Sequence, residues 1–197
     1  HERGDDLAVD DHPAAGHGTL GISIQTMIPV SAEDAAAIEA QLGRTPRAMA
    51  GVAWRCPCGR PGVVATRPRL PNGDPFPTTY YLTCPRAQAA CSTLESSGLM
   101  REMADRLVAD GQLRAQYAAA HRAYLADRER LAEGEVPEIA GISAGGMPDR
   151  VKCLHALLGH ALAAGPGVNP LGDEVAERLG RFWEHPCLGE EQWCGQR

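Results

Sequence analysis

Polar and apolar positions near the start of the chain predict one helix followed by short strands. Ser31 can cap a helix, Asp34 follows three residues later as in a capping box, and Gly43 ends the apolar stripe. Three short, partly apolar runs follow, joined by turns rich in Pro and Gly, at residues 49–55, 62–66 and 78–83. Tight turns join antiparallel strands, so these runs predict a small three-stranded antiparallel sheet.

The rest of the chain carries helical spacing of apolar residues. Predicted helices span residues 85–96, 99–110, 112–132, 148–164 and 174–183. With the sheet, this pattern predicts a single α+β domain of about six helices over residues 26–187. Residues 1–25 are acidic and rich in Gly, which predicts a disordered tail, and residues 188–197 are expected to form an irregular C-terminal tail.

Charge and hydropathy narrow the class of protein. The 197 residues carry a net charge of −6, whereas general nucleic-acid binders are more often basic, so there is no strong nucleic-acid signal. No apolar run reaches the roughly 18 residues of a membrane helix, and no signal-peptide pattern opens the chain. We therefore expect no membrane association and a cytoplasmic location.

Seven cysteines without a secretory signal favour reduced thiols, some of them metal ligands, over a disulfide framework. Cys56 and Cys84 are each followed by proline, and a Cys-Pro step occurs at iron–sulfur ligands. Cys153 lies near a predicted helix start beside Arg150 and Lys152, where the helix dipole and the cations favour a thiolate. These three cysteines are the predicted metal ligands.

A fourth ligand is expected from Cys58 or His155. Cys153 and His155 are two residues apart, so within a regular helix they point to nearly opposite sides and converge only if the helix begins irregularly. Otherwise His155 continues an apolar stripe and is expected in the core. His160 is seven residues from Cys153, roughly 10 Å along a helix, which is too far to share one ion.

The remaining cysteines are weaker candidates. Cys91 lies inside a predicted helix, where a small buried side chain is expected. Cys187 and Cys194 lie in the irregular end and are not chosen as ligands. The ligand types leave iron–sulfur cluster and zinc both open, because thiolates serve both.

A glycine-rich loop before the predicted helix at residues 148–164 is a candidate anion site. Backbone N–H groups of Gly145 and Gly146, with Arg150 and Lys152, have the character of an anion-binding helix entry. Cys153 and Lys152 are the candidate catalytic residues there. Arginines also surround the predicted strands, which is typical of either a phosphate-binding or a solvated face, at Arg55, Arg60, Arg67, Arg69 and Arg86.

Three motifs resemble one known family. They are RCPCGRP at residues 55–61, PFPTTYYLTCP at 75–85 and MPDRVKCLH at 147–155, and an Asn-Pro step at residues 169–170 also fits. Over residues 30–187 the chain resembles the bacterial, largely actinobacterial family called domain of unknown function 501. The resemblance implies a cytosolic protein and places the family's motif cysteines at Cys56, Cys84 and Cys153, with His155 adjoining and Cys58 belonging to only part of the family. It implies no activity.

Three functions follow as hypotheses. The first is a metal-binding protein with an iron–sulfur cluster or zinc, acting as an enzyme on an anionic small molecule. The second is a non-catalytic interaction protein of cell division or envelope control, because the resemblance implies gene neighbours that include a septum-formation initiator-like protein. The third is a metal-free thiol enzyme that uses Cys153.

Overall fold

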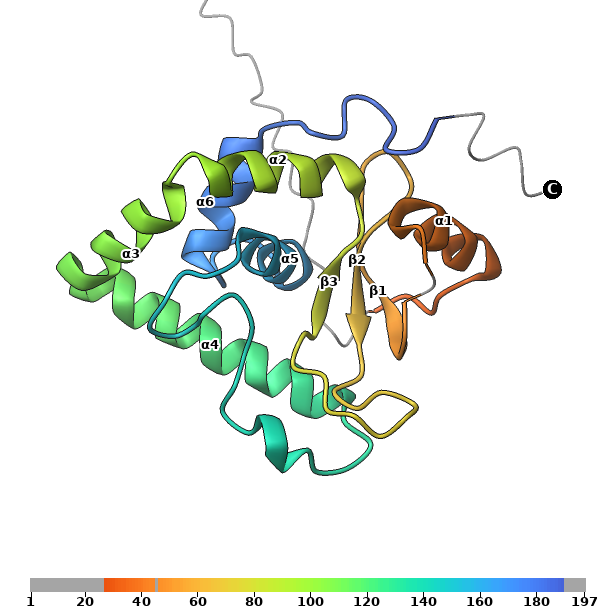
Figure 1. Ribbon diagram of the computed structural model, residues 1–197, viewed down its shortest axis with the longest axis horizontal. Helices are drawn as coiled ribbons and strands as arrows, with labels where there is room; N and C mark the ends of the chain where they lie inside the picture. Colours follow the sequence, from red (N-terminus) through yellow and green to blue (C-terminus); the bar gives the residue numbers. More distant parts are fainter. Residues whose placement is uncertain (1–26, 45, 190–197) are drawn as a thin grey trace, which may run out of the picture.

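The computed structural model describes residues 27–44 and 46–189 and confirms the predicted α+β arrangement (Figure 1). A three-stranded antiparallel sheet has the order β1-β2-β3, with strands β1 (Met49–Arg55), β2 (Pro61–Thr66) and β3 (Tyr80–Leu82). The helices are α1 (Ala32–Leu42), α2 (Pro85–Ser96), α3 (Leu99–Ala109), α4 (Gly111–Leu131), α5 (Leu154–Ala164) and α6 (Pro170–Leu179). A 3-10 turn, η2 (Pro137–Ile139), lies in the loop after α4.

The sheet separates α1 from the other helices, as Figure 1 shows. Helix α1 contacts β2 on one side, while α5 contacts all three strands from the other. Every residue of β2 is buried, as expected for the central strand. Helix α5 also packs on α2 and α6, so it is the element around which the other helices are arranged.

Local sequence signals explain where most elements begin. The capping box of α1 is present, since Asp34 N–H donates to Ser31 Oγ at 3.0 Å and Ser31 N–H donates to the Asp34 carboxylate. Helix α2 has Pro85 at its first position, where proline's missing N–H costs nothing. Asp110 caps α4 by accepting from the N–H groups of Gln112 and Leu113.

Two of the predicted helices have wrong bounds. Helix α5 begins at Leu154 rather than at residue 148, because residues 145–152 close on themselves through backbone hydrogen bonds and Cys153 is extended at φ −157°. Helix α6 begins at Pro170 rather than at residue 174. Asn169 caps it by accepting from Gly172 N–H at 3.0 Å, and the helix ends before Gly180. The Asn-Pro step was the sequence signal for that earlier start.

His160 lies at the centre of the core. Its ring is stacked on Tyr80 with centroids 5.7 Å apart and meets Tyr124 edge-on at 5.2 Å. The amide of Asn169 lies 3.2 Å from Nδ1, which fits donation to a neutral imidazole. His160 is therefore a core residue and, as its position in the helix predicted, contributes nothing to a site shared with Cys153.

Burial of His160 predicts acid sensitivity. Desolvation lowers the pKa of His160 to about 4 from 6.5, so the unfolded chain binds the extra proton first as pH falls. Stability is present above pH 6.5 and is lost toward pH 4, by about 2 kcal/mol between pH 7 and pH 5. Urea unfolding at both pH values should show this loss in the wild type and a loss smaller by that amount in His160→Gln. Equal losses in the two proteins would contradict it.

The predicted ends of the domain are only partly described. The predicted tail at residues 1–25 lies outside the described residues, as does most of the predicted C-terminal tail. Of that C-terminal stretch, Leu188 is described and is 7% exposed. In the described part of the chain, no helix is long and apolar enough to cross a membrane.

Candidate metal centre

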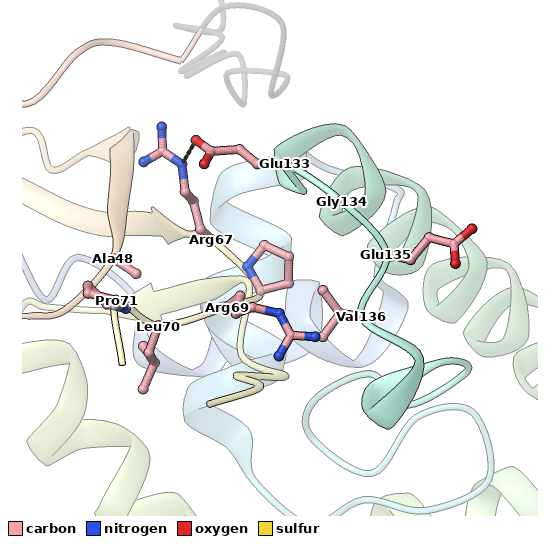
Figure 2. Close-up of a pocket in the computed structure, with 10 residues that line it drawn as sticks. Ala48, Arg67, Arg69, Leu70, Pro71, Glu133, Gly134, Glu135 and Val136 are labelled. Carbon is pink, nitrogen blue, oxygen red and sulfur yellow. Dashed lines mark hydrogen bonds and ion pairs between the residues drawn. The ribbon is translucent and has the colours of Figure 1, made fainter. Parts of the chain in front are cut away.

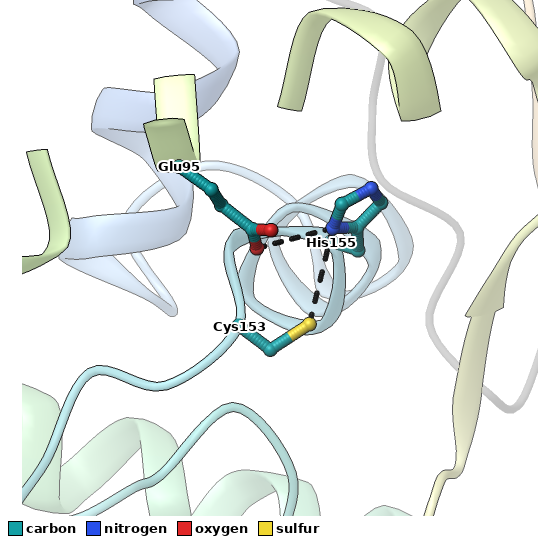
Figure 3. A group of neighbouring side chains, drawn as sticks. All are labelled: Glu95, Cys153 and His155. Carbon is teal, nitrogen blue, oxygen red and sulfur yellow. Dashed lines mark hydrogen bonds and ion pairs between the residues drawn. The ribbon is translucent and has the colours of Figure 1, made fainter. Parts of the chain in front are cut away.

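Three side chains that can bind a metal meet where α2 ends and α5 begins (Figure 3). Glu95, Cys153 and His155 each present a donor atom, and the three atoms lie within 4.8 Å of one another. His155 Nδ1 is 3.1 Å from Glu95 Oε1 and 3.9 Å from Cys153 Sγ. The tetrahedral bond lengths of zinc imply about 3.4 Å between N and O ligands and about 3.6 Å between N and S ligands. The three atoms are therefore spaced nearly as one ion needs.

The irregular start of α5 brings Cys153 and His155 together. Cys153 is the extended residue before the helix, so its side chain escapes the helical geometry that would point it away from His155. The condition set by the sequence is thus met, and His155 is half-buried at the site rather than a core residue. Glu95 is fixed from α2, since its Oε1 accepts the first N–H of the helix, that of Leu154, at 2.7 Å.

The second ring nitrogen of His155 is held by the protein. Nε2 lies 3.1 Å from the backbone carbonyl of Gln88 and 3.4 Å from Ser92 Oγ. A carbonyl can only accept, so Nε2 carries a proton and donates to it. Histidines that bind metals usually donate their other N–H in this way, which leaves the opposite nitrogen free for the ion. His155 thus directs Nδ1 toward Cys153 and Glu95.

Without an ion, charge holds the same three groups together. The hydrogen bond with Cys153 and that with Glu95 outweigh burial and raise the pKa of His155 to about 9. The hydrogen bond from His155 is the main cause that lowers the pKa of the Cys153 thiol. At neutral pH His155 is therefore an imidazolium between the Glu95 carboxylate and the Cys153 sulfur, and a divalent cation can replace its proton.

The three predicted cysteine ligands do not form one site. Cys84 is the N-cap of α2, whereas Cys153 lies beside Glu95 near the other end of that helix, about 16 Å away along its axis. Sequence spacing gave no information on this separation, because it depends on which end of α2 the start of α5 reaches. Cys56 and Cys58 instead lie with Cys84, in a thiol group that also includes Cys187.

The glycine-rich loop lacks the helix N-terminus that an anion site was expected to use. Lys152 N–H donates to Gly145 O and Arg150 N–H to Gly146 O, both at 2.8 Å, so these two N–H groups are already bonded. The first N–H of α5 is bonded to Glu95. The loop is therefore not a helix entry, because α5 begins at Leu154. Anion binding by the N–H groups of Gly145 and Gly146 with the exposed side chains of Arg150 and Lys152 stays a prediction.

The arginines around the sheet pair with acidic groups or with backbone carbonyls. Arg55 forms two hydrogen bonds with Asp34, at 2.8 and 3.0 Å. A cavity of about 430 Å³ lies between the loop after β2 and the loop after α4, and there Arg67 donates to Glu133 at 2.8 Å. Figure 2 shows the residues that line it. The other pairs are Arg69 with Glu138, Arg60 with Glu33 and Arg86 with the carbonyl of Pro186. These contacts favour a solvated, ion-paired face over a phosphate or RNA surface.

Sequence reasoning missed Glu95 and gave too little weight to Cys187. Glu95 lies 58 residues before Cys153, as one of many acidic residues, and no motif marked it. Only the high number of cysteines in the chain pointed to Cys187, because no motif surrounds it. Lys152 is exposed next to Cys153, and nothing described assigns it a catalytic role. The expected protein partner in cell division also stays a prediction.

Comparison with known proteins gives a family and no activity. A family model described as "Protein of unknown function (DUF501)" matches residues 52–177, more than half of the chain. This match confirms the resemblance drawn from the three motifs, and it covers Cys56, Cys84, Glu95, Cys153 and His155. Neither the curated proteins nor the solved structures contain a significant match.

Proposed function

We propose, on the premise that the chain belongs to the DUF501 family of proteins of unknown function, that it binds a metal ion through Glu95, Cys153 and His155. The observation that carries the proposal is the meeting of three different donor atoms within 4.8 Å, with His155 Nδ1 turned toward the other two. The proposal revises the predicted ligand set by separating Cys153 from Cys56 and Cys84.

The ligand types favour zinc at this site over an iron–sulfur cluster. Iron–sulfur clusters are usually held by four cysteines, and this group contains one thiol. Zinc accepts thiolate, imidazole and carboxylate together in tetrahedral sites. A negative thiolate and carboxylate with a neutral imidazole would balance the charge of a divalent ion.

Three protein ligands are the arrangement of catalytic zinc sites, which keep the fourth position open. Glu95 and His155 are about a quarter exposed, so solvent and small molecules can reach the group. An ion bound there would supply Lewis-acid chemistry to an oxygen of such a molecule. Arg150 and Lys152, exposed just before Cys153, support the notion that this molecule is anionic.

Metal counting tests the proposal. The full chain, stripped of metal under reducing conditions, is titrated with zinc and its bound zinc is measured by mass spectrometry of the metal. Cys153→Ser is expected to bind one equivalent less than the wild type, because a hydroxyl is a poor zinc ligand. His121→Ala, a change on α4 outside this group, should bind as much as the wild type. Equal stoichiometry in Cys153→Ser and the wild type would overturn the proposal.

A metal-free thiol enzyme is the second candidate, favoured by the 3.9 Å approach of Cys153 Sγ to His155 Nδ1. Nucleophilic cysteines are activated by an adjacent histidine in this way. Alkylation of the metal-free protein, mapped by peptide mass, should modify Cys153 before the other cysteines in either case. Added zinc should then protect Cys153 if the metal proposal holds, and unchanged labelling with zinc favours the thiol enzyme.

A further inference from the structure

We infer that Cys56, Cys58, Cys84 and Cys187 form a second metal site, a four-thiolate zinc site that fastens residues 180–189 to the sheet and to the start of α2. This site is separate from the Glu95, Cys153 and His155 group, because the two lie at opposite ends of α2. It does not rest on the proposed function above. The role is structural, since four protein ligands leave no open position on zinc.

A tight turn presents the first two thiols. Cys56 follows β1, its N–H donates to Arg60 O at 2.9 Å, and its carbonyl accepts from Gly59 N–H at 2.8 Å. Gly59 has φ +86°, a conformation that favours glycine, and this lets the chain reverse within the turn. Cys56 is buried and Cys58 is half-buried, so the turn directs both toward the interior of this corner.

The other two thiols arrive from separate parts of the chain. Cys84 is fully buried and is the N-cap residue of α2. Cys187 comes from the stretch after α6 and lies 3.9 Å from Cys58, Sγ to Sγ. The Cys84 thiol interacts electrostatically with both Cys187 and Cys56. The four thiols are thus neighbours in the order Cys58, Cys187, Cys84, Cys56.

The Sγ–Sγ distance between Cys58 and Cys187 excludes a disulfide and is compatible with two ligands of one ion. A disulfide holds its sulfurs at about 2.05 Å, so these two are not bonded. Tetrahedral zinc with bonds of about 2.3 Å separates two thiolates by about 3.8 Å. The observed 3.9 Å matches the spacing around a zinc ion.

Ion binding must still draw the four sulfurs inward. Within residues 27–44 and 46–189, no three of them lie within 4.8 Å of one another. A change of the χ1 rotamer moves a cysteine Sγ by on the order of 3 Å, so side-chain rotation can close the site without moving the strands. The ion displaces the thiol protons as it binds.

The surroundings suit four thiolates rather than four buried thiols. Gln41 Nε2 donates to Cys187 Sγ at 3.2 Å and also to Pro61 O at 2.8 Å, which fixes the amide against the sulfur. Such N–H donors to ligand sulfurs are the outer contacts that metal sites use. Residues 180–189 contain no helix or strand, and besides this cluster they are held by Arg86 on Pro186 O and by the packing of Phe182 on Trp54.

Cobalt and zinc titrations of the metal-free full chain test this site. Thiolate-to-cobalt absorption in the near ultraviolet grows with the number of thiolates, so this site should give about four times the signal of a one-thiolate site. In the Cys153→Ser, His155→Ala double variant one strong cobalt site should remain. Adding Cys58→Ser or Cys187→Ser should lower zinc affinity by more than about 100-fold. Such a loss exceeds the effect of mutating a residue that only hydrogen-bonds to a metal ligand. Both thiols are half-buried, which limits the structural cost of the changes.

Two outcomes would overturn the inference: full zinc affinity in both Cys58→Ser and Cys187→Ser, or no thiolate–cobalt band in the double variant. If the wild type is coloured and contains iron, and both variants lose the colour and the iron, the site holds an iron–sulfur cluster and the zinc assignment is overturned. If the variants fail to fold, alkylation of the wild type decides instead. Cys58 and Cys187 should be protected by zinc and exposed by a chelator, and equal labelling in both conditions counts against the site.

Discussion

His155→Ala is expected to weaken zinc binding at the Glu95, Cys153 and His155 group by about 100- to 1,000-fold. Structural zinc sites gain about 10–16 kcal/mol in all, or about 3–4 kcal/mol for each of four ligands, and that loss corresponds to this factor. Loss of the ring also leaves Glu95 and Cys153 as two negative groups with no cation between them. Competition with a coloured zinc indicator, in the Cys58→Ser background, measures the affinity of this site alone.

His121→Ala is the matched control for that measurement. His121 lies on α4, where its Nδ1 is 2.8 Å from Ser143 Oγ, and it is not part of the metal-binding group. It should leave zinc affinity unchanged. Glu95→Gln should have an intermediate effect, because an amide oxygen remains but the negative charge is lost. Affinity that falls equally in the His121 and His155 variants would point to general destabilisation and contradict ligation by His155.

Local sequence signals were sufficient for much of the fold. Strand β1 and helix α2 have the predicted bounds because a Pro or Gly residue marks where each neighbouring turn begins. Helix α5 was predicted too long because Pro148 suits a first helical turn, and only the hydrogen bonds within residues 145–152 reveal that the chain turns there instead. Such bonds depend on where the loop packs, which sequence periodicity does not record.

Long-range packing decided the sites, and for that reason they were only half predictable. Residue type and turn context selected Cys56, Cys84 and Cys153 correctly as thiols in special settings, but the distance between them depends on the path of α2. His155 shows the opposite case. Its role depends on the local backbone at the start of α5, and the extended conformation of Cys153 there places His155 in the site. Glu95 required knowing that α2 ends against the start of α5.

The close packing of α6 on α5 leads to the second large prediction, at Gly172. A Cβ on Gly172 would lie 2.3 Å from the carbonyl oxygen of Leu157 and 2.7 Å from the Cβ of Ala161. Both obstacles belong to α5, and one of them is backbone, so neither can rotate away. Gly172→Ala must therefore push α6 off α5, which we expect to cost about 2–4 kcal/mol despite alanine's better helix propensity.

Gly134→Ala provides the control for this substitution. A Cβ at Gly134 has no atom within 4 Å and the residue has no left-handed φ, so its stability should stay within about 0.5 kcal/mol of the wild type. Urea unfolding of the metal-free proteins measures both. Leu157 lies one turn or less from His155, so displacement of α5 by Gly172→Ala should also weaken zinc binding at the Glu95, Cys153 and His155 group. A Gly172→Ala protein as stable as the Gly134 variant would show that the two helices separate without cost, and would contradict α5 as the rigid support of that group.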